Sequence, residues 1–212
     1  MKTNKDKKII IIGAGGHGKV AADIALELGY QDIAFLDDDT NKQECLGFPV
    51  KGIISDLEKY EQNDFFVAIG NNRLRKKISE RLFELDYNLV SLIHPKAIIA
   101  DKVRIGKGTI IMPGAIINVD SIIGKGCIIN TASTIDHDNV LGKYVHVSAG
   151  CHLAGEVIVK DHTFIGIGSI VSNSLTIEHD VTIGAGSTVL DNIPANCTAV
   201  GTPCKPIKYN QK

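Results

Sequence analysis

A six-residue repeat constrains this chain more than any other feature of its sequence. From Ala97 to Asn192 the chain divides into hexads without a gap, and the third residue of each hexad is aliphatic. These residues are Ile99, Ile105, Ile111, Ile117, Ile123, Ile129, Ile135, Leu141, Val147, Leu153, Val159, Ile165, Val171, Ile177, Ile183 and Val189. A strict period of six does not follow the 3.6-residue period of a helix, and it is the signature of a parallel β-helix.

The repeat predicts a triangular prism in which three hexads close one coil of eighteen residues. The aliphatic residue and the small residue two positions before it point inward, while residues suited to turns, such as the Gly, Asn or Asp that often follows the aliphatic one, serve the corners. Cys127 and Cys151 occupy the small inward slot and are expected in the core. Because proline cannot continue a ladder, we expect the chain to leave the repeat at Ile193-Pro194 and to pack over the last coil.

The sequence before residue 96 follows a different pattern. KKIIIIGAGGHGKVAADIALELGY predicts a strand, a glycine-rich turn and a helix ending near Gly29, and IAFLDDD and DFFVAIGNN predict further strands. Strands that alternate with helices indicate a small Rossmann-like parallel α/β domain, with its ligand site at the carboxyl ends of the strands. A hinge at His94-Pro95 then predicts domains 1–95 and 96–212.

The glycine-rich turn, residues 13–18, satisfies GxGxxG, and Asp37 follows about twenty residues on. Fewer than a hundred residues cannot supply both halves of a dinucleotide-binding domain. We therefore interpret the turn as a site for one anion or one nucleotide at a helix N-terminus. The alternative is a turn that serves only close packing of strand and helix.

Bulk composition excludes several classes of protein. Lys and Arg (23) nearly balance Asp and Glu (24), which argues against nucleic acid or an anionic membrane as the main partner. The apolar run IIIIG is too short for a signal peptide or a membrane span, so a cytoplasmic location is expected. Five cysteines form no CxxC pair and no zinc spacing, and Cys197 and Cys204 have no assigned role.

GAGGHGK, FLDDD, VAIGNN, the hexads, IDHD and VHVSAG occur in this order along the chain. Together they resemble the sugar O- and N-acetyltransferases grouped with sialic acid O-acetyltransferase, and particularly the UDP-4-amino-sugar N-acetyltransferases of bacillosamine biosynthesis. The resemblance implies a left-handed β-helix, a homotrimer, acetyl-CoA as co-substrate without a metal, and a role in making glycan precursors. It also implies which residues hold the nucleotide-sugar, namely Gly15, Gly16, His17, Asp37, Asp38 and Gly70.

The same resemblance assigns the transfer site. His137 takes the place of the general base, and Asp138 would raise its basicity where the similar enzyme has Glu. His146 matches the residue near the thioester, and Ile167 and Ala185 match backbone contacts to coenzyme A, with Ala185 replacing a glycine.

The chemistry of the IDHD hexad agrees with this assignment. Acetyl transfer to an amine needs a proton acceptor, and a histidine beside a carboxylate is suited to that role. The alternative is that Asp136, His137 and Asp138 form a merely solvated corner. His94 is expected at the hinge, and His152, His162 and His179 are expected to be surface residues without such an acid-flanked arrangement, although edge contacts of His162 and His179 stay open.

Coil arithmetic separates the assigned residues. Ile167 and Ala185 differ by eighteen and stack on one edge, and His146 lies near it. His137 is one side of the prism away, roughly 15 to 20 Å at about 3.3 Å per residue. The site is therefore predicted to be shared between subunits.

Three functions remain open from the sequence. The first is N-acetylation of a UDP-linked 4-amino-dideoxy sugar. The second is O-acetylation of sialic acid or N-acetylation of GDP-perosamine. The third is a non-catalytic β-helix that binds a nucleotide-sugar.

Overall fold

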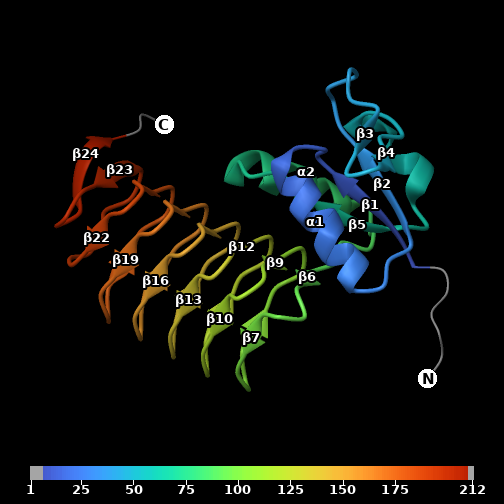
Figure 1. Ribbon diagram of the computed structural model, residues 1–212. Helices are drawn as coiled ribbons and strands as arrows, with labels where there is room; N and C mark the ends of the chain where they lie inside the picture. The colour runs from blue at the N-terminus through green and yellow to red at the C-terminus, as the bar shows by residue number, and fades with distance from the viewer. Residues whose placement is uncertain (1–6, 210–212) are drawn as a thin grey trace. The chain divides into compact units, whose positions relative to one another are not determined.

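The computed structural model describes residues 7–209 and divides into two compact units, Met1–Pro95 and Lys96–Lys212 (Figure 1). The helices α1 (Gly16–Glu27) and α2 (Asn72–Glu84) have 12 and 13 residues. A membrane-spanning helix needs about 20 apolar residues. Within residues 7–209, no helix combines the length and the apolar character that a crossing of the bilayer requires.

The first unit is built on a parallel sheet of three strands in the order β2-β1-β5. Its strands are β1 (Lys8–Ile12), β2 (Asp32–Leu36) and β5 (Asp64–Val67). The other elements are the hairpin of β3 (Glu44–Cys45) and β4 (Phe48–Pro49), the 3-10 helix η1 (Ile54–Tyr60) and β6 (Leu92–Ile93). The sequence predicted the parallel α/β arrangement, and the hairpin and η1 are additions.

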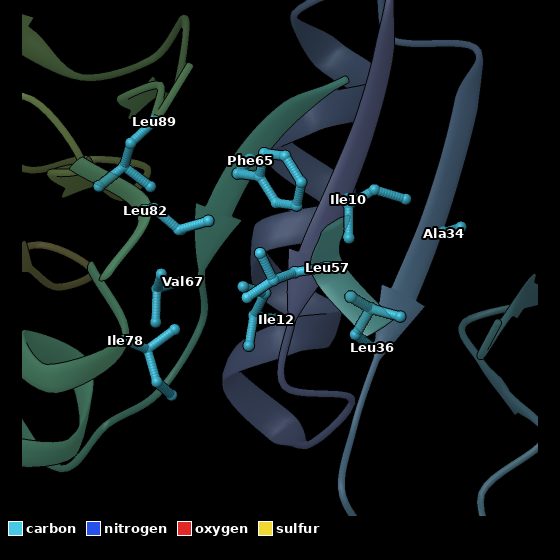
Figure 2. Packing of buried hydrophobic residues seen from close by; sticks show 10 residues of the cluster. All are labelled: Ile10, Ile12, Ala34, Leu36, Leu57, Phe65, Val67, Ile78, Leu82 and Leu89. Carbon is cyan, nitrogen blue, oxygen red and sulfur yellow. The ribbon is translucent and has the colours of Figure 1, made fainter. Parts of the chain in front are cut away.

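Side chains from alternate positions of β1 face opposite sides of this sheet. Ile10 and Ile12 pack with Leu57 of η1 and with Ile78 and Leu82 of α2 (Figure 2). The alternate isoleucines of β1 are equally buried on the other side, where α1 packs. Both faces of the sheet are therefore covered. Because the three strands are parallel, the loops that follow them lie at the same carboxyl edge of the sheet.

The second unit is a parallel β-helix. Ile117 pairs with Ile135, and Ile135 pairs with Leu153, so that each coil takes eighteen residues as predicted. One side holds β7 (Ile98–Ile99), β10 (Ile116–Ile117), β13 (Thr134–Ile135), β16 (His152–Leu153), β19 (Ile170–Val171) and β22 (Thr188–Val189). The second holds β8 (Arg104–Ile105), β11 (Ile122–Ile123), β14 (Val140–Leu141), β17 (Ile158–Val159) and β20 (Thr176–Ile177). The third holds β9 (Ile110–Ile111), β12 (Ile128–Ile129), β15 (His146–Val147), β18 (Phe164–Ile165), β21 (Thr182–Ile183), β23 (Cys197–Val200) and β24 (Lys205–Tyr209).

Two inward positions in each hexad fill the prism. From Ile111 onward the aliphatic residue is at most 2% exposed, and Cys127 and Cys151 are buried in the small slot as expected. Polar residues in that slot bond to backbone carbonyls, either three residues back, as Ser133 does to Asn130, or in the next coil. The Thr163 hydroxyl, for example, donates to the carbonyl of Glu178 at 2.7 Å. The slot therefore supplies partners for corner carbonyls as well as packing volume.

The corners differ from the sequence prediction. Every sixth residue from Lys102 to Gly186 has a φ between +54° and +72°, and this residue stands three places after the aliphatic one. The residue directly after the aliphatic one still belongs to the ladder; the N–H of Gly142, for instance, donates to the carbonyl of Val159. The expectation that this earlier residue makes the turn was wrong, because its N–H is still paired with the next coil.

The eighteen-residue spacing of paired residues ends after β22, where Ile193 pairs with Ile177 and Thr198 with Thr182. Ile193 still bridges to Ile177, β23 pairs in parallel with β21, and β24 folds back antiparallel on β23. The chain therefore leaves the eighteen-residue repeat at Ile193 and packs over the last coil, as the sequence predicted, and it does so as further paired β structure. Pro194 is tolerated because it lies between two paired segments and not within one.

A matched pair of glycine substitutions tests the corner packing. Both Gly114 and Gly126 have left-handed φ angles, so alanine carries the same conformational cost, about 1 kcal/mol, at each. A Cβ at Gly126 would overlap the Tyr144 ring, whereas at Gly114 the nearest atom would be 3.8 Å away. Gly126→Ala should therefore lower the free energy of unfolding by about 1 to 3 kcal/mol more than Gly114→Ala. Denaturant titration measures the difference, and equal losses would contradict this packing.

Candidate active site

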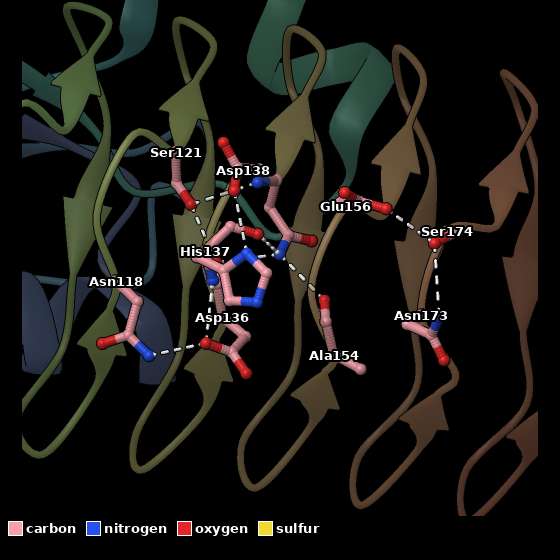
Figure 3. A network of polar contacts seen from close by, with 10 residues as sticks. Asn118, Ser121, Asp136, His137, Asp138, Ala154, Glu156, Asn173 and Ser174 are labelled. Atoms are coloured by element: carbon pink, nitrogen blue, oxygen red, sulfur yellow. Dashed lines mark hydrogen bonds and ion pairs between the residues drawn. The ribbon is translucent and has the colours of Figure 1, made fainter.

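The corner after β13 carries an imidazole bonded to a carboxylate. His137 Nδ1 lies 2.8 Å from Asp138 Oδ2 (Figure 3). Asp138 occupies the left-handed corner position, with φ at +58°, which aspartate tolerates better than most residues. About half of the His137 side chain is exposed (51%), so a substrate can reach it. With Nδ1 bonded to the carboxylate, Nε2 is the nitrogen left to accept a proton.

Acidic groups on both sides of His137 raise the pKa of its imidazole. The hydrogen bond with Asp138 raises the pKa of His137, partial desolvation opposes that rise, and the charges of Asp136, Asp138 and Glu156 add to it. The Asp136 carboxylate accepts hydrogen bonds from the Asn118 amide and from the His137 N–H, both at 2.8 Å, and these bonds hold its pKa below the usual range. The corner thus fits a histidine that gains a proton during reaction.

Gly155, one coil further on, is a residue that the sequence analysis missed. A Cβ built there would lie 2.6 Å from Cε1 and 2.7 Å from Nε2 of His137. The imidazole therefore rests against a bare backbone. The eighteen-residue spacing from His137 to Gly155 was the signal that could have identified it.

A second corner repeats this arrangement. His179 Nδ1 lies 3.1 Å from Asp180 Oδ2, and Asp180 also faces His162 at 3.8 Å. The expectation that His179 lacks an acid-flanked arrangement was wrong. The hexads Ser-Thr-Ile-Asp-His-Asp and Leu-Thr-Ile-Glu-His-Asp place the same residue types at the same corner positions, so the sequence already carried this signal.

The expected coenzyme contacts lie at a different corner from His137. Ile167 and Ala185 stack in successive coils after the third side, where the N–H of Gly186 donates to the carbonyl of Ile167. His146, on β15 of that side, meets the ring of Phe164 edge-on at 5.0 Å. His137 follows the first side. A single β-helix therefore brings His146, Ile167 and Ala185 to one edge and leaves His137 at another.

This edge is smooth and open. Ile167 is 60% exposed, and a Cβ at Gly168 or Gly186 would meet no atom within 4 Å. Its outermost residues carry no charge, unlike those of the corner that holds Lys143, Asp161 and His179. Such an edge suits contacts from exposed backbone groups to an extended ligand.

In the first unit, the glycines between the end of β1 and the first turn of α1 fall into two groups. Gly13 and Gly18 are required by packing, because a Cβ on Gly18 would overlap the carbonyl of Gly13, and a Cβ on Gly13 would lie 2.8 Å from the carbonyl of Ala68. Gly15 and Gly16 are exposed, and a Cβ at either would meet nothing within 4 Å. Close packing of strand and helix therefore does not explain the second group.

The acids after β2 lie at the same sheet edge. Burial alone would raise the pKa of Asp37, but the N–H groups of Asp39 and Ala14 and the Lys42 ammonium hold it below the usual value. Asp37 thereby fastens the β1–α1 loop to the end of β2. Asp38 is exposed, and its Oδ1 accepts from the Ile54 N–H at 2.9 Å.

His17 and Gly70 complete the set from the sequence. Burial, with a smaller effect of the nearby Arg75 charge, lowers the pKa of His17 to about 4, so the ring is neutral at pH 7. Its Nε2 is buried and has no hydrogen-bond partner within residues 7–209. Arg75 Nη1 donates to the carbonyls of Ile69 and Gly70 at 2.9 and 3.1 Å. Sequence reasoning missed this buried arginine, which fixes the loop after β5.

Within the described part of the chain, no group of three or more His, Cys, Asp or Glu side chains is placed to hold a metal ion.

Comparison with known proteins relates both units to sugar acetyltransferases. Residues 8–82 match the PglD N-terminal domain family. The chain superposes on the acetyltransferase domain of PglB from Neisseria gonorrhoeae in complex with acetyl coenzyme A, with a TM-score of 0.92 and 40% identity over 95% of this chain and 100% of that one. For PerB from Caulobacter crescentus in complex with CoA and GDP-perosamine, the TM-score is 0.91 and the identity 38%, over 95% and 97% of the two chains.

A curated relative supports the same grouping. The UDP-N-acetylbacillosamine N-acetyltransferase of Bacillus subtilis is 37% identical over 111 residues, which are 50% of this chain and 51% of that protein. The match spans 51% of this relative, 49% of the GDP-perosamine N-acetyltransferase of Escherichia coli O157:H7 and 21% of a protein of Acanthamoeba polyphaga mimivirus. Full-length matches to the two solved structures confirm the family, the left-handed β-helix and the parallel α/β domain that the sequence predicted. The chain belongs to the family of sugar acetyltransferases that share a PglD-type N-terminal domain and a left-handed β-helix.

Proposed function

We propose that this protein transfers the acetyl group of acetyl-CoA to the 4-amino group of a UDP-linked amino-dideoxy sugar. The observation that carries the proposal is the His137–Asp138 contact of 2.8 Å on an exposed corner of an acetyltransferase fold. Acetyl-CoA as donor is supported by the complex of the Neisseria relative. A non-catalytic β-helix would have no need for an exposed histidine with a raised pKa.

His137, Asp138 and the coenzyme edge have different roles in the reaction. The neutral amine attacks the thioester carbonyl, and Nε2 of His137 takes the proton that the amine loses. As the tetrahedral intermediate collapses, the C–S bond breaks, and the departing thiolate of coenzyme A receives that proton and leaves as the thiol. Asp138 keeps the Nδ1 proton in place and stabilises the imidazolium. The edge of His146, Ile167 and Ala185 holds coenzyme A.

The nucleotide-sugar is held by the first unit. Gly15, Gly16 and Gly70 have exposed backbones with room for a ligand, and α1 directs its unpaired N–H groups toward the same loop. The unpartnered Nε2 of neutral His17 and the exposed Asp38 supply polar contacts. The chain thus keeps base, coenzyme edge and nucleotide-sugar loop as three separate sets of residues.

The similarity to PerB favours GDP-perosamine as the alternative acceptor, because that relative is solved with GDP-perosamine. Thiol release from acetyl-CoA, measured with a panel of UDP- and GDP-linked amino sugars and with sialic acid, distinguishes the candidates. Turnover confined to a GDP-sugar or to sialic acid would reject the UDP-sugar. Absence of turnover with every acceptor would favour the binding function.

Substitution of His137 tests the base. His137→Ala should lower kcat by roughly 10² to 10⁴ and leave substrate binding nearly unchanged, because proton transfer occurs only in the transition state. His179→Ala is the matched control, since it removes the imidazole from the second acid-flanked corner. Near wild-type turnover of the His137 variant would remove this residue from the mechanism.

Substitution of Gly15 tests the loop. A side chain there meets no protein atom, so Gly15→Leu should leave the thermal unfolding temperature nearly unchanged. It should weaken nucleotide-sugar binding in calorimetry and leave coenzyme A affinity intact, because the side chain occupies space assigned to the ligand. Unchanged nucleotide-sugar affinity would contradict the assignment, and tight binding of NAD would favour the dinucleotide interpretation.

The separate corners of base and coenzyme edge support a homotrimer whose sites lie between subunits. His137→Ala and Ala185→Trp chains should each be inactive alone. Mixed trimers formed after subunit exchange should regain part of the activity, because some interfaces pair an intact base with an intact coenzyme edge. Mixed trimers that are verified by mass spectrometry and remain inactive would place both elements of the site in one subunit.

A further inference from the structure

Asn139 occupies the small inward slot directly after the His137 corner. It is completely buried, and its amide nitrogen lies 2.8 Å from the carbonyl oxygen of Asp136, 3.2 Å from that of His137 and 2.9 Å from that of Ala154. Hydroxyl side chains in this slot also bond to backbone carbonyls; the Thr163 hydroxyl donates to the carbonyl of Glu178, and the Ser169 hydroxyl lies within hydrogen-bond distance of the carbonyls of Gly166 and Gly184. The Asn139 amide therefore lies within hydrogen-bond distance of three backbone carbonyls from two successive coils.

The three carbonyls belong to the coil of the base and to the coil of its support. Asp136 and His137 lie on the corner of the imidazole, and Ala154 directly precedes Gly155, against which the ring rests. The carbonyl of His137 also accepts from the N–H of Glu156, just after Gly155. The Asn139 amide thus connects the His137 corner with the backbone before Gly155. The distance between these two segments determines the space available to the imidazole ring.

The second acid-flanked corner shows what the repeat does without this amide. There the inward residue after the corner is Val181, and the corner carbonyl of Glu178 accepts from the Thr163 hydroxyl. The equivalent bond at the first corner, from the Ser121 hydroxyl to the carbonyl of Asp136, is also present at 2.8 Å. The Asn139 bonds are therefore additional to the bracing that an ordinary corner receives.

From these contacts we infer that Asn139 is a positioning residue, which holds the His137 imidazole against Gly155 and in line with Asp138. The inference rests on the proposed role of His137. Loss of the amide would let the corner and the next coil shift, so that Nε2 would no longer face the acceptor amine in one fixed direction. Displacements of about 1 Å are enough to cost roughly 10²-fold in rate.

A graded series in the slot tests the inference. Valine fits this slot at Val145, Val157 and Val181, and serine in it donates to the carbonyl three residues back, as Ser133 does to Asn130. Asn139→Val should lower kcat roughly 10- to 100-fold with little change in the KM of either substrate. Asn139→Ser should regain part of the loss because one carbonyl bond returns.

Thr163→Val is the matched control, since it removes a buried corner bond at the second acid-flanked corner without changing the side-chain shape. It should keep wild-type kcat even if its unfolding temperature falls as far as that of Asn139→Val. Equal kcat for Asn139→Val and Thr163→Val would overturn the inference, because the slot would then serve packing alone. If Asn139→Val does not fold, the serine variant decides in the same way.

A titration of the His137 imidazole by NMR separates this inference from the proposed function. The charged groups around the ring are Asp136, Asp138 and Glu156, and its hydrogen bond to Asp138 raises its pKa. Asn139→Val should shift the titration toward that of an ordinary histidine, and Thr163→Val should not. An unshifted titration in Asn139→Val would overturn the positioning role. Wild-type activity of His137→Ala would instead overturn the proposed role of His137 as the base, and absence of turnover with every acceptor would overturn the proposed function, whatever the titration shows.

Discussion

The eighteen-residue stacking of coils is the constraint on which the rest of the β-helix depends. Each two-residue strand is too short to be stable alone, and it persists because its backbone pairs with the coils before and after it. Side chains one coil apart therefore lie one above the other. This is how Gly155 comes to lie beside His137, and how Ala185 comes to stack on Ile167.

Much of the fold could be predicted because the repeat reports directly on burial. Inward positions are occupied almost throughout by aliphatic or small residues, so the hexads reveal the sides, the coil length and the two cysteines of the core. The first unit was predictable for a related reason, since the buried run Ile9–Ile12 and the glycine turn after it indicate a central parallel strand. The hairpin β3–β4 and η1 were missed because short edge elements leave no periodic pattern.

The site was less predictable, since it depends on contacts between residues that are distant in sequence. His137 and Asp138 are adjacent in the chain, so their contact could be foreseen. Arg75 resembles one more cation on an amphipathic helix until the structure shows it buried beneath the loop after β5. Asn139 interrupts a series of small residues, and only its three carbonyl partners explain why an amide is present there.

The glycines between β1 and the first turn of α1 suggest how sequence differences among related chains should be interpreted. Gly13 and Gly18 are demanded by the backbone itself, so they should persist in descendants that have lost all activity but still fold. Gly15 and Gly16 cost the fold nothing to replace, so only selection for a ligand would preserve them. A related chain in which Gly15 and Gly16 are replaced while Gly13 and Gly18 are kept would therefore belong to a lineage in which this segment no longer binds a ligand.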